Sequence, residues 1–278
     1  MLRKLLKYDF KSILKLWFIP SLSLYLLSFP VGYVIRLSSL PKNIPLGIQI
    51  SSMLGTAVLI LGLFVYLILT AVLIFKRFYK NFFTDEGYLT FTLPVKRNQL
   101  LFSKALFGTI TYSATVFVFI VTLFNLILMS YQPSTEPTET ISIITTLNNA
   151  LGMGTSISVM YAFTVLLLII AIFVLLNCIS VLFMYFCITI ASMIAKKNKV
   201  ISAVGIYYLS NSTVSFFAML FMLFGLDSIF QWTAGFSEKE GVIFFLLALL
   251  LASALLALIS TCFYLIIYRM LDKKLNLA

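Results

Sequence analysis

Five polar residues gather within six positions near residue 210, in the middle of an apolar stretch. They are Ser210, Asn211, Ser212, Thr213 and Ser215. Hydroxyl and amide groups donate and accept hydrogen bonds, but none is a strong acid, base or cation. The cluster therefore suits either hydrogen bonding between membrane helices or the lining of an uncharged path for a hydrophobic or amphipathic cargo. Asn177, which also lies within an apolar stretch, allows the same two interpretations.

Missing residue types exclude several kinds of chemistry. The chain has no histidine, so it can form neither an HExxH metal site nor a Ser-His catalytic pair. It contains no G-x-x-x-x-G-K-[ST] loop, so we expect it to bind no nucleotide phosphates itself. Its apolar stretches carry no carboxylate that could bind a coupling cation or relay a proton. We therefore expect neither an enzyme nor a protein with its own cofactor or metal.

A second group of interest lies in the segment 76–104, which is basic and aromatic. It includes Phe82, Phe83, Asp85, Glu86, Gly87, Tyr88 and Phe91. One interpretation is an aromatic belt with solvated charges at the lipid interface. The other is a docking segment, in which aromatic rings fill a partner's groove and the acids pair with its Lys or Arg side chains. The residues alone leave both open.

The chain contains six long apolar runs. They span 16–35, 53–75, 105–129, 157–195, 200–224 and 242–268, without a single Lys, Arg, Asp or Glu. Each reaches the roughly 20 residues that a helix needs to cross a membrane. The sequence therefore predicts an all-α integral membrane protein with six transmembrane helices and a single domain over 1–278. The run 157–195 would form a helix of about 58 Å, and we expect one long span there rather than two.

The basic residues predict the orientation of the spans. If both termini are cytosolic, only Arg36, Lys42 and Lys239 fall outside, and the other Lys and Arg residues fall inside. This bias is the positive-inside rule, and it places 76–104 and 196–199 in the cytosol. The segments 131–150 and 226–241 are then external. Within the latter region, 225–241 is expected to form a hairpin at the interface.

The N-terminal segment 1–15 is expected to be an amphipathic interfacial helix. Apolar residues recur at spacings of three and four, and basic residues fill the opposite face. The basic residues are Arg3, Lys4, Lys7, Lys11 and Lys15. The chain would then turn into the first span, where Pro20 and Pro30 are expected to kink or break the helix.

The segment DEGYLTFTLPVKRNQLLFSK, residues 85–104, closely resembles the cytosolic loop after the second span of ABC-2-type transporter permeases from Gram-positive bacteria. The opening MLRKLLKYDFK and the ending KKLNL resemble the termini of the same family. The resemblance implies an exporter in the bacterial cytoplasmic membrane, built from two permeases (identical or paralogous) and two cytosolic ATPase subunits. Segment 76–104 would hold the coupling helix that contacts the ATPase, and segment 1–15 the elbow helix. ATP and Mg²⁺ would bind to the ATPase.

We therefore expect the permease subunit of an ATP-driven exporter, with a cargo such as an antimicrobial or toxin-like peptide, and no nucleic-acid partner. A drug or a lipid is an alternative cargo. An alternative from a different class is a membrane immunity or sensor protein that binds a peptide without transporting it. The residues expected to line the path are Asn177, Ser210, Asn211, Thr213 and Ser215.

Overall fold

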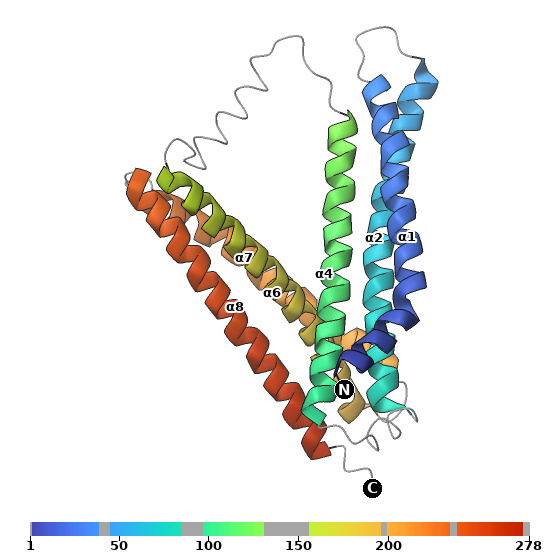
Figure 1. Cartoon of the computed structure of the whole chain (residues 1–278), viewed down its shortest axis with the longest axis vertical. Coiled ribbons are helices and arrows are strands. Elements are labelled where there is room, and N and C mark those ends of the chain that lie inside the picture. Colours follow the sequence, from blue (N-terminus) through green and yellow to red (C-terminus); the bar gives the residue numbers. More distant parts are fainter. Residues whose placement is uncertain are drawn as a thin grey trace. The chain divides into compact units, whose positions relative to one another are not determined.

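A computed structural model describes the backbone over residues 2–38, 45–84, 97–130, 156–195, 199–233 and 238–274. These ranges form six α-helices (Figure 1): α1 (Leu2–Ser38), α2 (Leu46–Phe83), α4 (Arg97–Ser130), α6 (Ser156–Ile194), α7 (Lys199–Thr233) and α8 (Glu238–Lys274). Each helix includes a stretch long and apolar enough to cross a membrane. Over the described ranges, the prediction of an all-helical protein with six such helices is confirmed.

The bounds of α6, α7 and α8 test two predictions, one about the long span 157–195 and one about the segment 225–241. The apolar run 157–195 forms one unbroken helix, α6, of 39 residues, as expected for a single long span. The segment 225–241, predicted as an external hairpin, is helical over most of its length, because α7 continues to Thr233 and α8 begins at Glu238. Its location outside the membrane stays a prediction. A continued helix satisfies its own backbone hydrogen bonds, whereas an irregular segment near the membrane must find other partners.

The N-terminal segment is continuous with the first span. α1 runs from Leu2 to Ser38 without a break, with Pro20 and Pro30 inside it. Its first turns lie at an angle to the rest of the helix (Figure 1). The expected change of direction is therefore present, but no break separates an elbow helix from the span. The location of residues 1–15 at the lipid interface stays a prediction.

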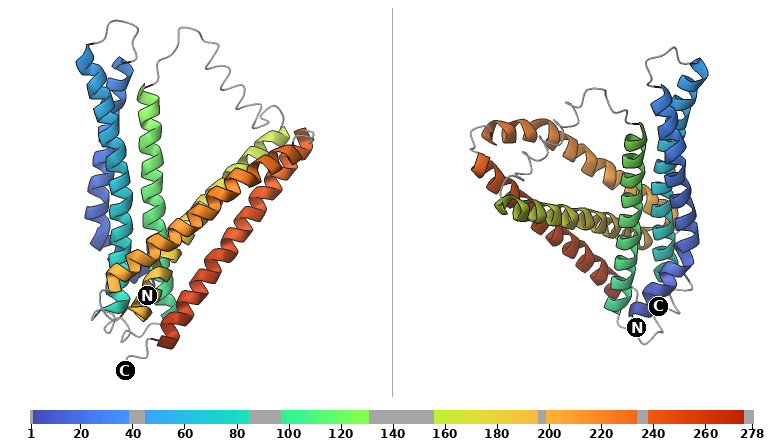
Figure 2. Two further views of the ribbon diagram at one scale, coloured as in Figure 1. Left: turned by 180° about the vertical axis from the view of Figure 1, so that it is seen from behind. Right: turned by 45° about the horizontal axis from the view of Figure 1, so that its top comes forward.

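Contacts divide the chain into two compact units, and both α2 and α4 contribute to each. The first unit comprises 1–77 and 102–159, and contains α1 with most of α2 and α4. α1 and α2 run side by side in both views of Figure 2. Hydrogen bonds between uncharged side chains join α1 to α4: the Trp17 indole N–H donates to Thr115 Oγ1 at 2.8 Å, and Asn125 Nδ2 donates to Ser28 Oγ at 2.6 Å. Such bonds are the usual polar links between membrane helices.

A glycine allows α1 and α4 to approach closely near the end of the unit that holds Ser130. A Cβ added at Gly32 would lie 2.5 Å from the Cβ of Met129 and 3.3 Å from the carbonyl oxygen of Leu126. Neither atom is the far end of a flexible side chain, so the backbones themselves would have to move apart. Small residues permit this kind of contact between membrane helices.

We predict that Gly32→Ala lowers the free energy of unfolding by about 1–3 kcal/mol, the usual cost of overpacking. Gly205→Ala is the matched control, because a Cβ added at Gly205 meets nothing within 4 Å. Unfolding of both variants in detergent micelles tests the expectation. Equal stability of the two variants would show that the close approach at Gly32 is absent in the folded protein.

The second unit comprises 78–101 and 160–278. Aromatic rings fill its packed end. Tyr185 of α6 stacks on Phe78 of α2 with ring centroids 3.9 Å apart and planes 9° from parallel. Phe183, also on α6, contacts Tyr207 of α7 and Phe263 of α8 with centroids 5.8 Å apart in both pairs. The last turns of α2 therefore pack against α6, which also contacts α7 and α8.

Candidate functional site: the ends of segment 76–104 and the polar cluster of α7

Three charged side chains meet where segment 76–104 begins and ends. Asp9 of α1 accepts hydrogen bonds from Arg77 of α2 and Lys104 of α4. The Arg77 Nε and Nη2 atoms lie 3.0 and 2.8 Å from Asp9 Oδ1. The Lys104 Nζ atom lies 2.7 Å from Oδ1 and 2.6 Å from Oδ2. One carboxylate thus binds two cations from opposite ends of the segment, and we call this group the Asp9 triad.

Burial distinguishes the Asp9 triad from an ordinary surface salt bridge. The side chains of Asp9 and Lys104 are 2% and 7% exposed, whereas that of Arg77 is 28% exposed. A buried charge is costly unless a partner compensates it. Because Asp9 provides that compensation for Lys104, the start of α1 must stay beside the start of α4. The hydrogen bonds hold residues 9, 77 and 104 together at one end of their unit. The predicted orientation requires all three to be on the same side of the membrane.

Sequence reasoning counted these three residues only as cytosolic charges. One signal could have singled out Asp9: it is the only acidic residue before Asp85, within a strongly basic segment. The signal does not reveal the partners of Asp9, because Arg77 and Lys104 follow it in the sequence by 68 and 95 residues.

Within the second unit, the two ends of segment 76–104 contact other helices. Phe78 stacks on Tyr185 of α6, and the Tyr264 hydroxyl of α8 hydrogen-bonds Asn98, with 3.2 Å to its carbonyl oxygen. Phe82 is 4% exposed and its ring centroid lies 4.9 Å from that of Phe78. The Phe82 ring is therefore packed inside this chain.

The remaining residues predicted to contact a partner are less constrained. Phe83 is half-buried, with its ring centroid 6.2 Å from that of Phe78 and 6.0 Å from that of Tyr79. Five of the predicted residues lie outside the described part of the chain: Asp85, Glu86, Gly87, Tyr88 and Phe91. The role of the whole set stays a prediction.

The polar cluster of α7 faces outward. Ser210 is half-buried, while Asn211, Ser212, Thr213 and Ser215 are exposed. The Thr213 hydroxyl donates to the Ser210 carbonyl oxygen at 2.8 Å, so it is bonded within its own helix.

Asn177 is buried and hydrogen-bonded within its own helix. It is 6% exposed, and its Nδ2 donates to the Phe173 carbonyl oxygen of the same helix at 2.7 Å. No hydrogen bond between described residues joins it to the polar cluster of α7. The predicted path residues of α7 are therefore neighbours on one helix, and no hydrogen bond within the described part of the chain links Asn177 to them.

No family model, curated protein or solved structure matches this chain significantly. Among the described residues, no three His, Cys, Asp or Glu side chains form a group that could hold a metal ion. The features available for inferring function are therefore the six apolar helices, the Asp9 triad, the exposed polar cluster of α7, and the sequence of segment 76–104.

Proposed function

We propose that this chain is the membrane-spanning permease subunit of an ATP-driven exporter. ATP and Mg²⁺ bind to a separate cytosolic ATPase, and this chain catalyses no reaction itself. Three features support the proposal: six helices able to cross a membrane, the sequence of residues 85–104, and the way in which both ends of segment 76–104 are held.

The Asp9 triad is the observation that carries the proposal. A loop that transmits a partner's movement to the spans must have its ends fixed to them, because a loosely attached loop would absorb the movement. Arg77 and Lys104 share one buried carboxylate at distances of 2.6–3.0 Å. The segment between them is therefore connected to α1 as well as to its own two helices, α2 and α4. This attachment suits a segment that receives force from an ATPase.

The exposed polar cluster on α7 suggests that this face of the helix contacts either a cargo path or a second permease copy rather than lipid. Polar side chains in a membrane helix are placed most favourably against polar neighbours or water, because lipid offers neither. In the most apolar part of α7, and likewise of α8, only 6% of the residues are buried within this single chain. We propose that the α7 cluster borders a path for an amphipathic cargo, formed with a second permease copy or a paralogue. An antimicrobial or toxin-like peptide fits this uncharged lining; drugs and lipids are further possibilities.

Isolation of the native complex tests the proposal. The full chain, carrying an affinity tag, is purified in mild detergent from the membranes of its own cell. We expect a stoichiometric ATPase subunit with a phosphate-binding loop, whose ATP hydrolysis in reconstituted vesicles depends on this chain. Peptide binding without any associated ATPase would contradict the proposal and support the immunity or sensor function.

We predict that Asn211→Leu reduces export at least several-fold without lowering stability, because an exposed residue contributes little to folding. The matched variant is Asn125→Leu, whose buried amide bonds Ser28 and which is expected to lose about 0.6–1.7 kcal/mol of unfolding free energy. Vesicle export and micelle unfolding are measured for both. Normal export by Asn211→Leu would exclude Asn211 from the path, and a stability loss like that of Asn125→Leu would indicate helix packing instead.

A further inference from the structure

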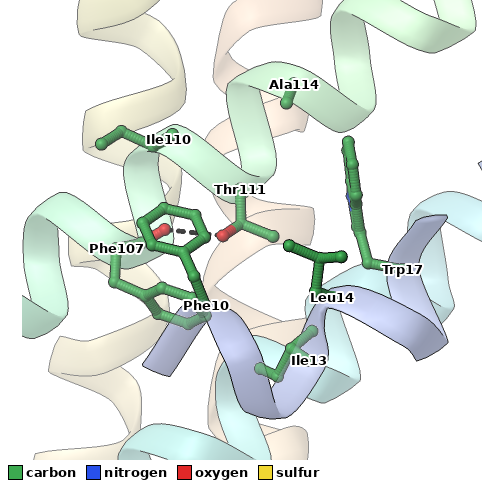
Figure 3. A pocket seen from close by; sticks show the side chains of 8 residues that line it. All are labelled: Phe10, Ile13, Leu14, Trp17, Phe107, Ile110, Thr111 and Ala114. Atoms are coloured by element: carbon green, nitrogen blue, oxygen red, sulfur yellow. Dashed lines mark hydrogen bonds between the residues drawn. The ribbon is translucent and has the colours of Figure 1, made fainter. Parts of the chain in front are cut away.

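A groove runs along the outside of the first unit, between α1 and α4. It consists of two cavities of about 80 and 260 Å³ that share Trp17 in their walls. Figure 3 shows the smaller cavity, where Phe10, Leu14 and Trp17 of α1 lie opposite Phe107 and Ala114 of α4. We call the two cavities together the α1–α4 groove.

The groove exists because α1 and α4 are joined at intervals. At one end, Asp9 bonds Lys104 and the ring of Phe10 packs edge-on against Phe107 with centroids 5.0 Å apart. Further along, the Trp17 indole donates to Thr115. Between these contacts, Ala114 contributes only a methyl group and leaves space unfilled. The groove opens outward, since Leu14 of its wall is 53% exposed.

Basic side chains border the groove. Lys7, Lys11 and Lys15 are all exposed and recur every four residues, so they form one row along α1. Each precedes a groove residue, Phe10, Leu14 or Phe18, by three positions, which places the row directly beside the groove.

The charge of this row is not neutralised by the acid nearest in sequence. Asp9 is 2% exposed and already bound to Arg77 and Lys104. Among the described residues, no acidic side chain forms a salt bridge with any lysine of the row. Within the described ranges, the row therefore presents three exposed positive charges without an acidic partner, starting at the end of the groove where α1 begins.

We infer that the α1–α4 groove binds one anionic phospholipid. Its phosphate contacts the row of Lys7, Lys11 and Lys15, and an acyl chain lies in the groove against Trp17. Lysine side chains reach from apolar surfaces to the headgroup level, and basic pockets between membrane helices on the cytoplasmic side bind anionic headgroups. A row of positive charges beside an apolar groove matches an anionic lipid, which has a charged headgroup and apolar chains. Because the row is predicted to be cytosolic, the lipid would come from the cytoplasmic leaflet. The inference does not depend on an ATPase partner.

Trp17 reports on the occupant directly. The chain has only two tryptophans, so Trp232→Phe leaves Trp17 as the sole indole. The full chain is reconstituted in phosphatidylcholine vesicles containing increasing fractions of a lipid with a brominated acyl chain, which quenches nearby indole fluorescence. We expect brominated phosphatidylglycerol to reach half-maximal quenching at a mole fraction at least about fivefold lower than brominated phosphatidylcholine, as one lysine contact alone would give.

Two variants separate the headgroup contact from the acyl-chain contact. Changing Lys7, Lys11 and Lys15 together to Gln is expected to remove the preference for phosphatidylglycerol, whereas changing all three to Arg retains it. Ala114→Phe fills the groove and is expected to weaken quenching while the lysines remain. Lys76→Gln/Arg269→Gln, which removes two exposed cations on other helices, is the control and is expected to keep the preference.

Ionic strength provides a test without mutation, because salt screens the lysine–phosphate attraction. The preference of the unmodified groove is expected to fall as salt rises. Equal quenching by the two brominated lipids at low salt would overturn the inference and indicate ordinary surrounding lipid. A preference that survives the triple Gln change would also overturn it, since the headgroup would then be recognised elsewhere.

Discussion

Asp9→Asn is expected to lower the free energy of unfolding by about 3–5 kcal/mol, the usual cost of removing one partner from a buried ion pair. The reason is that the ammonium group of Lys104, whose side chain is 7% exposed, would lose the carboxylate that compensates the cost of its burial. Arg77 is more exposed and can turn toward water, so Lys104 dominates the loss. Unfolding of the purified chain in detergent micelles measures the change.

Matched variants make the expectation specific to the Asp9 triad. Lys104→Met alone should be milder, because Arg77 still binds the carboxylate of Asp9. Asp9→Leu/Lys104→Met should recover most of the loss, since apolar replacements of a buried pair are often neutral. Lys11→Met, an exposed position on the same helix, should change stability by less than about 0.5 kcal/mol. If Asp9→Asn were as stable as Lys11→Met, Asp9 would not be compensating a buried charge.

Asp85→Lys/Glu86→Lys is expected to reduce ATPase binding, or export per ATP hydrolysed, by about tenfold or more. In the proposed docking these two acids meet basic side chains of the ATPase, so reversing their charges would replace attraction with repulsion at the interface. Insertion and folding should survive, because the Asp9 triad fixes the ends of the segment without these two acids. Vesicles reconstituted with the isolated ATPase report binding, hydrolysis and export separately.

The control for this variant reverses two other acids. Glu136→Lys/Glu139→Lys changes the same total charge in the segment predicted to be external, and should leave all three measurements nearly unchanged. Full coupling in the Asp85→Lys/Glu86→Lys protein would show that these acids take no part in docking. Equal defects in both variants would point to net charge rather than to a specific contact.

The number and type of helices could be predicted from the sequence because a bilayer demands about 20 apolar residues per span. Contacts between helices could not, because they depend on how each helix is rotated. Asn177 shows the difficulty: a polar amide within an apolar stretch suits a path, yet this amide bonds the carbonyl of Phe173 in its own helix. Residues 225–233 show another, since their aromatic side chains suit an interfacial loop and a helix equally well.

The rotation of each helix also determines which charged side chains are buried and which are exposed. Lys104 and Lys11 carry the same charge and look alike in the positive-inside pattern, but one is buried on Asp9 and the other is exposed. The closeness of Gly32 to Met129 likewise follows from which faces of α1 and α4 meet, and nothing in the local sequence around Gly32 predicts it.

The unbroken length of α6 has a consequence for the membrane in which this protein works. A helix of 39 residues extends about 58 Å, and even a tilt of 40°, the upper end for transmembrane helices, leaves a projection of about 45 Å across a hydrocarbon layer of about 30 Å. Leu166, Leu167 and Ile170, near its start, are more than half exposed and apolar. Hydrophobic mismatch should therefore favour thicker bilayers, which cover more of this surface, and longer acyl chains should stabilise the protein.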